Sequence, residues 1–444
     1  MSIVTRVAGT LVAVVLVAAC GSARPPSPPG RDLGTPRRDL LPNGVRVIVQ
    51  EHRAADVVAV QLWVGVGGRD EAPEELGLAH YLEHMLFKGT STRPPGFVDR
   101  DVERVGGRIN AATSFDYTYY HAVLPAARMA SAVEMLADVA VNAALDPALL
   151  DTEKRVVLEE MRLHDDNPRR FLARHLWELA FDGHPYGRPL IGRPDVIQAL
   201  TRDTLHGFYR RHYVSPAFVV VVVGDVDADQ ALARVRDTFG RIPRGQAARL
   251  PAPVPRPLTA RRGDVRRPGT HAYLGLAWLA PRLDHADAAA MELITGVLGQ
   301  LRSARLTTSL REKQGLVSSI TSGYTAMQAA GVASVTAQLE AVNLARVERE
   351  VLAEIARVRA RGITEPERRR AVTAAEARHQ FSLETAEGRA FALGRAETVW
   401  RMEEELAWVD RLRSVTLAQV RAVARRYFDP QRYARLALLP EGAR

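Results

Sequence analysis

One stretch of this chain, GLAHYLEHMLFKGT at residues 77–90, restricts its fold and chemistry more than any other. It contains the pattern H-x-x-E-H, made by His80, Glu83 and His84. On a helix that turns about 100° per residue, His84 lies about 40° from His80, and Glu83 lies about 60° to the other side. The three side chains therefore share one face, where two imidazoles can bind a divalent metal beside a carboxylate that can act on water. The alternative is an amphipathic helix that carries the pattern by chance.

The composition is that of an ordinary globular chain, and it excludes several functions. The 444 residues are enough for two or three domains with large cores. The net charge of +9 comes almost entirely from arginines that are spread along the chain, so we expect no nucleic-acid binding. The single cysteine, Cys20, excludes a disulfide within the chain and a metal site built from cysteines.

The first residues have the pattern of a bacterial lipoprotein signal. An apolar run at residues 7–19 has the length of a signal-peptide core, is too short to span a bilayer, and ends in Val-Ala-Ala directly before Cys20. We therefore expect residues 1–19 to be removed, Cys20 to be lipidated, and residues 20–37 to form a flexible tether. This predicts a protein of the cell envelope that is anchored only through its lipid, at the outer membrane and facing the periplasm. The alternative is an ordinary secretory signal that happens to end near a cysteine.

Apolar periodicity predicts a mixture of strands and helices in the first half. Alternating β-branched residues predict strands, and amphipathic spacing predicts helices. The expected strands are residues 45–50, 57–66 and 108–120, and the expected helices are the metal-binding stretch and residues 99–105, 129–145 and 151–162.

The last of these helices offers a further metal ligand. Catalytic zinc usually has three protein ligands, and a carboxylate from another helix would complete the pair of histidines. Glu153 and Glu160 are seven residues apart and share a face, whereas Glu159 lies about 100° from Glu160. Spacing alone leaves Glu159 and Glu160 as equal candidates.

Six stretches of the first half carry a family resemblance. In chain order they are GGRDE (67–71), GLAHYLEHMLFKGT (77–90), INAATSFDYTYY (109–120), EKRVVLEEM (153–161), HPYGRPLIG (184–192) and VVVVVGDVD (219–227). Together they resemble the pitrilysin, or insulinase-type, zinc metallopeptidases, and within that family the processing-peptidase-like branch. The resemblance implies an α+β fold of two homologous half-domains, each an antiparallel-rich sheet covered by helices.

The distribution of proline and arginine suggests where the halves meet. Residues 244–270 are rich in both and are interpreted as a linker. This predicts an N-terminal zinc-binding peptidase domain at residues 38–243 and a C-terminal domain at residues 271–444. The order of expected elements in the second half resembles that of the first, but H-x-x-E-H does not recur, so the second domain is expected to be free of metal.

The resemblance also implies roles for the residues of the site. It makes His80, His84 and Glu160 the ligands of one Zn²⁺ ion per chain, and it makes Glu83 the general base. The resemblance places Glu153 next to the catalytic residues but outside direct contact with the metal, where it can hold a ligand in position.

The expected substrate-binding residues depart in part from the family pattern. Asn110 and Ala111 match an edge strand on which family members lay the substrate backbone. Arg311 matches the arginine of a substrate-binding Arg–Tyr pair, but the tyrosine position holds Ser318. A serine hydroxyl is too short to replace the phenol. Either a homologous sister subunit supplies the pair in a heterodimer, or the chain is a slower peptidase that acts alone or as a homodimer.

These observations predict a zinc-dependent endopeptidase that cleaves unfolded peptides or flexible segments at the cell envelope. Its working unit is expected to be a chamber of four half-domains. One alternative is a non-catalytic binding or assembly subunit of the same fold, and another is a structural lipoprotein without metal.

Overall fold

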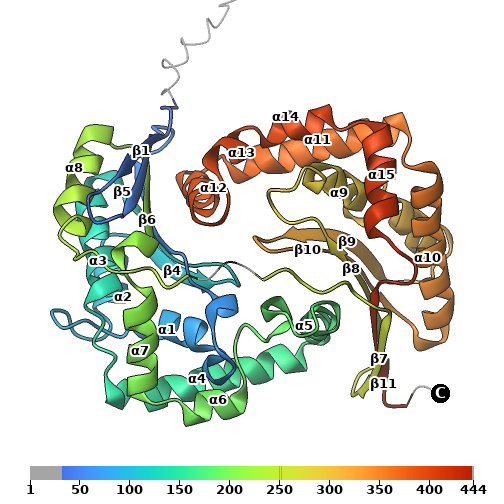
Figure 1. The fold of residues 1–444 in the computed structure, drawn as a ribbon, viewed down its shortest axis with the longest axis horizontal. Coiled ribbons are helices and arrows are strands. Elements are labelled where there is room, and N and C mark those ends of the chain that lie inside the picture. The colour runs from blue at the N-terminus through green and yellow to red at the C-terminus, as the bar shows by residue number, and fades with distance from the viewer. Residues whose placement is uncertain (1–32, 250, 252, 443–444) are drawn as a thin grey trace, which may run out of the picture.

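Two β-sheets, each covered by helices, make up the molecule (Figure 1). The computed structural model describes residues 33–442 except 250 and 252. The expected signal peptide and Cys20 lie outside the described residues. Within the described range, no helix combines the length and the apolar character needed to cross a membrane.

The first sheet has six strands in the spatial order β1-β2-β6-β3-β5-β4. All neighbours are antiparallel except β2 and β6, which are parallel. The strands are β1 (Arg37–Leu40), β2 (Arg46–Glu51), β3 (Val57–Val64), β4 (Arg108–Thr113), β5 (Thr118–Pro125) and β6 (Phe218–Gly224). Strand β4 pairs only with β5 and therefore forms an edge of the sheet.

The second sheet repeats this arrangement without a counterpart of β1. Its order is β7-β11-β8-β10-β9, and only β7 and β11 are parallel. The strands are β7 (Arg261–Arg267), β8 (Ala272–Ala280), β9 (Ser319–Ala326), β10 (Gly331–Leu339) and β11 (Ala434–Pro440). Matching β7 to β2 and β9 to β4 reproduces both the order and the strand directions. The predicted fold class, two similar halves with one helix-covered sheet each, is confirmed.

Two expected boundaries are wrong. Strand β7 lies inside residues 244–270, the expected linker. It was not expected there because its sequence, RRGDVRR, lacks the pattern of a strand. It is nevertheless an edge strand, where alternate charged residues remain exposed and protect the edge from further pairing. At the other end, Leu33 forms a bridge with His52 and β1 begins at Arg37, so part of the expected tether belongs to the first sheet.

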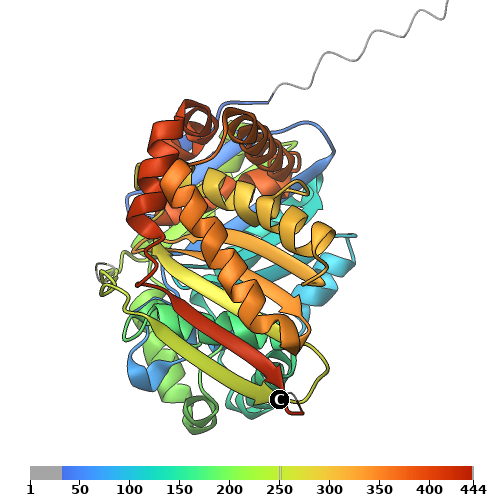
Figure 2. The same ribbon diagram turned by 90° about the vertical axis from the view of Figure 1, so that its right-hand side faces the viewer.

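Helices cover the outward face of each sheet, as Figures 1 and 2 show. In the first half they are α1 (Leu78–Leu86), α2 (Phe97–Glu103), α3 (Met129–Val141), α4 (Pro147–Asp166), α6 (Pro194–Ala199), α7 (Arg202–His212) and α8 (Ala228–Phe239). In the second half they are α9 (Ala288–Thr295), α10 (Leu344–Arg361), α11 (Glu365–Ser382), α14 (Trp408–Ser414) and α15 (Leu417–Tyr427). The short helix α13 (Met402–Leu406) contributes Met402 to the opposite face of the first sheet.

Each half also places one helix on the inner face of the other half's sheet. Helix α5 (Pro168–Ala180), from the first half, packs on β8 and β11 through Leu172 and Leu176. Helix α12 (Ala386–Val399), from the second half, packs on β3 and β6 through Ala390 and Leu393. Because β8 and β11 are the counterparts of β3 and β6, the exchange is reciprocal. The two halves are therefore held together by buried apolar surface from both sides.

Candidate active site

The N-terminus of α1 is fixed by contacts that explain two of the sequence motifs. Gly77 has a φ of +96°, and a Cβ there would lie 2.6 Å from the Cα atom of Gly192. The buried carboxylate of Glu71 accepts hydrogen bonds from the backbone N–H groups of Gly77 at 3.0 Å and Ala79 at 2.8 Å. These contacts satisfy donors that would otherwise be unpaired at the start of the helix. They set the position from which His80, Glu83 and His84 project.

Three side chains from α1 and α4 converge with the spacing of a metal site. His80 Nε2 and His84 Nε2 each lie 3.7 Å from Glu160 Oε2, and one ligand atom from each residue falls in a group within 4.8 Å. The 3.7 Å separations are too long for hydrogen bonds. Ligands about 2.1 Å from one tetrahedral zinc ion lie roughly 3.4 Å from each other, so a small closing movement would fit the ion. The donor set of two imidazoles and a carboxylate is one that catalytic zinc uses.

The fourth member of the helix face, Glu83, is held by the edge strand β4. The hydroxyl of Thr113 donates a hydrogen bond of 2.6 Å to Glu83 Oε2. Burial raises the pKa of Glu83, and the hydrogen bond from Thr113 opposes that shift. Glu83 lines the same cavity as His80 and Glu160.

Glu153 lies behind the metal cluster and orients His84. Its Oε1 lies 2.8 Å from His84 Nδ1, and its Oε2 forms an ion pair of 2.9 Å with Lys88. Burial acts to raise the pKa of Glu153, but hydrogen bonds from His84 and Lys88 lower it overall. Burial likewise opposes charge on His84, yet the bond to Glu153 and the carboxylates of Glu83 and Glu160 raise its pKa. With Nδ1–H bonded to Glu153, Nε2 of His84 is left to face Glu160.

The surroundings of His80 keep its imidazole ring uncharged. Burial, together with smaller effects of the neighbouring His84 and His164, lowers its pKa to about 3. The ring is therefore neutral at physiological pH, with a free lone pair, which is the form that binds metals. Among the described residues its Nδ1 has no hydrogen-bond partner.

A cavity of about 620 Å³ opens in front of this cluster. The end of β4 forms one wall through Ala111 and Thr113, and helix α5 forms another through Trp177. Since β4 is an edge strand, its free side can pair with an extended peptide.

Several of the remaining predicted residues lie away from the cluster of His80, His84 and Glu160 or from the cavity. Glu159, which spacing left equal to Glu160, points to solvent and pairs with Arg162, so it lies outside the cluster. Asn110 is exposed on β4, and its side chain accepts a hydrogen bond from the N–H of Ala111. Arg311 and Ser318 are not among the described residues that line the cavity, and the Ser318 hydroxyl donates to the carbonyl of Gln338.

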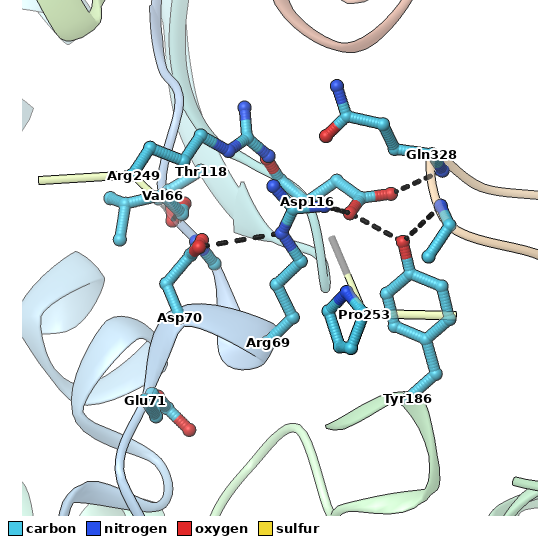
Figure 3. Close-up of polar contacts among 12 residues, drawn as sticks. Val66, Arg69, Asp70, Glu71, Asp116, Thr118, Tyr186, Arg249, Pro253 and Gln328 are labelled. Atoms are coloured by element: carbon cyan, nitrogen blue, oxygen red, sulfur yellow. Dashed lines mark hydrogen bonds and ion pairs between the residues drawn. The ribbon is translucent and has the colours of Figure 1, made fainter. Parts of the chain in front are cut away.

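A buried polar network ties the cavity wall to the second half of the chain (Figure 3). Asp116 accepts a hydrogen bond from the hydroxyl of Tyr186 at 2.7 Å and forms an ion pair with Arg69 at 3.2 Å. The backbone N–H of Gln328 donates to the other oxygen of Asp116, and the N–H of Ala329 donates to the Tyr186 hydroxyl. Both amides belong to the β9–β10 turn. The motifs GGRDE, INAATSFDYTYY and HPYGRPLIG therefore meet at the contact between the halves.

Sequence reasoning missed four residues that support the site. They are Glu71, Lys88, Thr113 and His164, and the first three lie within the motifs already quoted. His164 Nε2 lies 3.7 Å from Glu160 Oε1, one helical turn further along α4. The available sequence signal was that His164 follows Glu160 by four residues, a spacing that makes two side chains neighbours on a helix.

Known proteins are similar to this chain in sequence and in fold. The family described as insulinase (peptidase family M16) matches residues 46–194, and the M16 inactive domain matches residues 199–375. A protein of Mycobacterium bovis named as an uncharacterised zinc protease is 34% identical over 439 residues, which cover 95% of this chain and 97% of the relative. The β subunit of the mitochondrial-processing peptidase of Blastocladiella emersonii is 32% identical over 231 residues, 52% of this chain and 50% of the relative.

Two solved structures are similar over most of the chain. A protease from Helicobacter pylori has a TM-score of 0.87 at 25% identity, covering 92% of this chain and 100% of that one. The periplasmic protease PqqL of Escherichia coli has a TM-score of 0.77 at 20% identity, covering 91% of this chain but 47% of that one. The chain belongs to the insulinase (M16) peptidase family, a family of zinc proteases.

Proposed function

We propose that this chain is a zinc-dependent endopeptidase. The observation that carries the proposal is the convergence of His80, His84 and Glu160 within 4.8 Å, beside a cavity that is lined by His80, Glu83 and Glu160. His80, His84 and Glu160 would hold the zinc ion, which would supply a Lewis acid to polarise the scissile carbonyl and acidify a neighbouring water. Glu83, held by Thr113, accepts the proton of the attacking water and returns it to the leaving amine. Glu153 keeps His84 in the tautomer that presents Nε2 to Glu160.

We propose that the substrates are unfolded peptides or flexible segments. The free edge of β4, including Asn110 and Ala111, can hold an extended backbone by strand addition beside Glu83. Folded proteins do not present such an extended segment.

We propose that a second subunit completes the substrate site. Arg311 and Ser318 lie outside the described lining of the cavity, which supports a donor of the Arg–Tyr pair from another chain. The similar structure PqqL is about twice as long as this chain, and one relative is named as a subunit. The partner is proposed to be a homologous sister chain, or a second copy of this chain. We further propose that Cys20 carries a lipid that holds the protein at the outer membrane, facing the periplasm.

Metal analysis and peptide cleavage test the proposed function together. The purified chain should contain one zinc per chain and should cleave unfolded peptides when its partner is present. Glu83→Gln should keep the zinc and lose at least about a hundredfold in kcat, since general-base catalysis contributes that much. Glu159→Gln, on the exposed side of α4, is the matched control and should keep full activity.

A binding subunit of the same fold is the second candidate, favoured by Ser318 at the tyrosine position. It predicts zinc without cleavage under every partner condition. Full cleavage by the chain alone would contradict the heterodimer but not the peptidase.

A further inference from the structure

The second half contains a cavity that is the structural counterpart of the candidate active site. The active-site cavity is lined by α1, β4, α4 and α5, and the second cavity is lined by their counterparts α9, β9, α11 and α12. The two volumes are similar, about 620 Å³ and about 600 Å³. Duplication of the fold has therefore produced two cavities, of which only the first has the predicted metal ligands.

An ion pair takes the place of the metal cluster in the second cavity. Glu292 of α9 and Arg378 of α11 form a salt bridge of 2.6 Å. Helix α9 corresponds to α1, and Arg378 stands at the same position from the start of α11 as Glu160 does in α4. An arginine among the would-be ligands repels a cation, so this cavity is not built for a metal.

Two hydrogen-bond donors lining this cavity lack an ionic acceptor. Arg395 of α12 donates to the carbonyl of Ala326 at 3.4 Å and forms no ion pair with a described carboxylate. The indole Nε1–H of Trp400 is buried and has no acceptor among the described residues. Glu405 also lines the cavity; burial raises its pKa and the charge of Arg395 opposes that shift, but the two side chains form no ion pair. A ligand that brings a carboxylate would give Arg395 the ionic partner that it lacks among the described residues.

Aromatic side chains form part of the wall. Trp400 and Trp408 meet edge to face with ring centroids 5.8 Å apart, and Phe391 and Tyr324 line the same space. Such surfaces bind apolar side chains, while the guanidinium of Arg395 can fix a charged group. We propose that this cavity is a second, metal-independent binding site for a peptide carboxylate that is next to an apolar side chain.

The cavity is placed to take peptides that reach β4. Glu387 of α12 lines it and also forms ion pairs with Arg108 on β4 and with His121 on β5, the latter at 3.0 Å. One wall of the second cavity is therefore in direct contact with the strand that borders the active site. The inference goes beyond the proposed peptidase activity and does not depend on it.

Three acetylated dipeptides test the proposal in the full chain. The first is Phe-Phe with a free C-terminal carboxylate, the second is its amide, and the third is the amide of Phe-Glu. Binding is followed by calorimetry and by tryptophan fluorescence, in zinc-loaded and in chelator-treated protein, because a carboxylate can also bind zinc. We expect the free acid to bind about tenfold more tightly than the neutral amide in both preparations. The Phe-Glu amide shows whether the site takes any carboxylate or only a chain end.

The variant Arg395→Met tests the same site in a second way. It should weaken binding of the free acid about tenfold and leave binding of the amide unchanged. Arg401→Met, which removes a neighbouring arginine whose side chain is 71% exposed, should change neither. Equal affinities for acid and amide in the unmodified chain would overturn the proposal, whether or not the variants fold. Loss of the difference in chelator-treated protein would also overturn it, since the carboxylate would then be binding at the metal.

Discussion

At the scale of single residues, the site depends on hydrogen bonds behind the groups that would touch metal and substrate. Glu153 orients His84, and Thr113 orients Glu83. Both supporting contacts come from other elements than α1, so they fix the helix face in space as well as the individual rings. Removing the contact of Glu153 should impair zinc binding, and removing the contact of Thr113 should impair catalysis.

Glu153→Gln should weaken zinc binding by about ten- to a hundredfold, because outer-shell partners of ligating histidines have effects of that size. The amide cannot stabilise His84 as a carboxylate does, and it loses the ion pair with Lys88. Competition with a chelating dye measures the affinity. Glu159→Gln on the same helix is the control. An unchanged affinity in Glu153→Gln would show that Glu153 has no part in holding His84.

Thr113→Val should lower kcat roughly tenfold, the value of one hydrogen bond to a charged group, while zinc content stays the same. The substitution keeps the β-branched shape on β4 and removes only the bond to Glu83. Steady-state kinetics with a matched zinc assay checks it. Parallel losses of zinc and activity would mean that Thr113 supports the metal cluster instead.

Helical periodicity predicted that His80, Glu83 and His84 share a face, and the family resemblance implied that Glu160 joins them. The contacts of Thr113 and Lys88 were not predictable in that way. They join residues on different elements, and their partners depend on how β4 and α4 pack against α1. Glu159 and Glu160 were distinguished only by the packing of α4, or by family resemblance.

At the scale of elements, helix α1 is positioned by the turn that precedes it. Gly77→Ala should destabilise the protein by more than about 2 kcal/mol, since it adds left-handed strain to a backbone clash with Gly192. Gly183→Ala is a matched control, with a φ of +73° and no atom within 4 Å of the added Cβ. Chemical denaturation compares the two. Equal losses would mean that the Gly77–Gly192 contact contributes nothing beyond the strain.

Helix α7 gives a pH-dependent prediction. Burial, with a smaller contribution from nearby Arg211, lowers the pKa of His212 to about 4. The unfolded chain therefore binds more protons than the folded chain between pH 4 and 6.5, and stability falls as the pH is lowered through this range. Going from pH 7 to pH 5 should cost about 2 kcal/mol through this group. Urea unfolding of the unmodified chain and His212→Gln should differ by that amount in their pH dependence, and identical pH dependence would contradict it.

Most strands and helices were predictable from periodicity, and β7 was not. Its charged sequence reads as a linker because its stability comes from pairing with β11 at the end of the chain, a contact that local sequence does not reveal. The same lack of local signal applies to β1, which pairs with β2 at the end of the expected tether.

At the scale of the whole molecule, the two halves should unfold together. Helices α5 and α12 bury their apolar faces on the opposite sheets, so neither half has a complete core alone. Gly394→Leu should destabilise the entire chain, because even a Cβ there would lie 2.1 Å from Trp63 Nε1. Calorimetry should show one transition that moves to lower temperature. Two transitions, with only one of them shifted, would contradict the interlocked arrangement.

The duplication of the fold was predictable from the repeated order of strands and helices, but the helix exchange was not. Amphipathic spacing shows that α5 and α12 bury a face, and it does not show which sheet covers that face. The equivalence of the two cavities follows from the exchange and from the common strand order. It was therefore visible only in the folded chain.

The central claim is that His80, His84 and Glu160 hold one zinc ion beside Glu83. Anomalous diffraction at the zinc absorption edge, from crystals of the zinc-loaded chain, tests it most directly. We expect one peak about 2.1 Å from Nε2 of both histidines and from a carboxylate oxygen of Glu160. A peak at other side chains, or no peak at this cluster in protein that contains stoichiometric zinc, would contradict it.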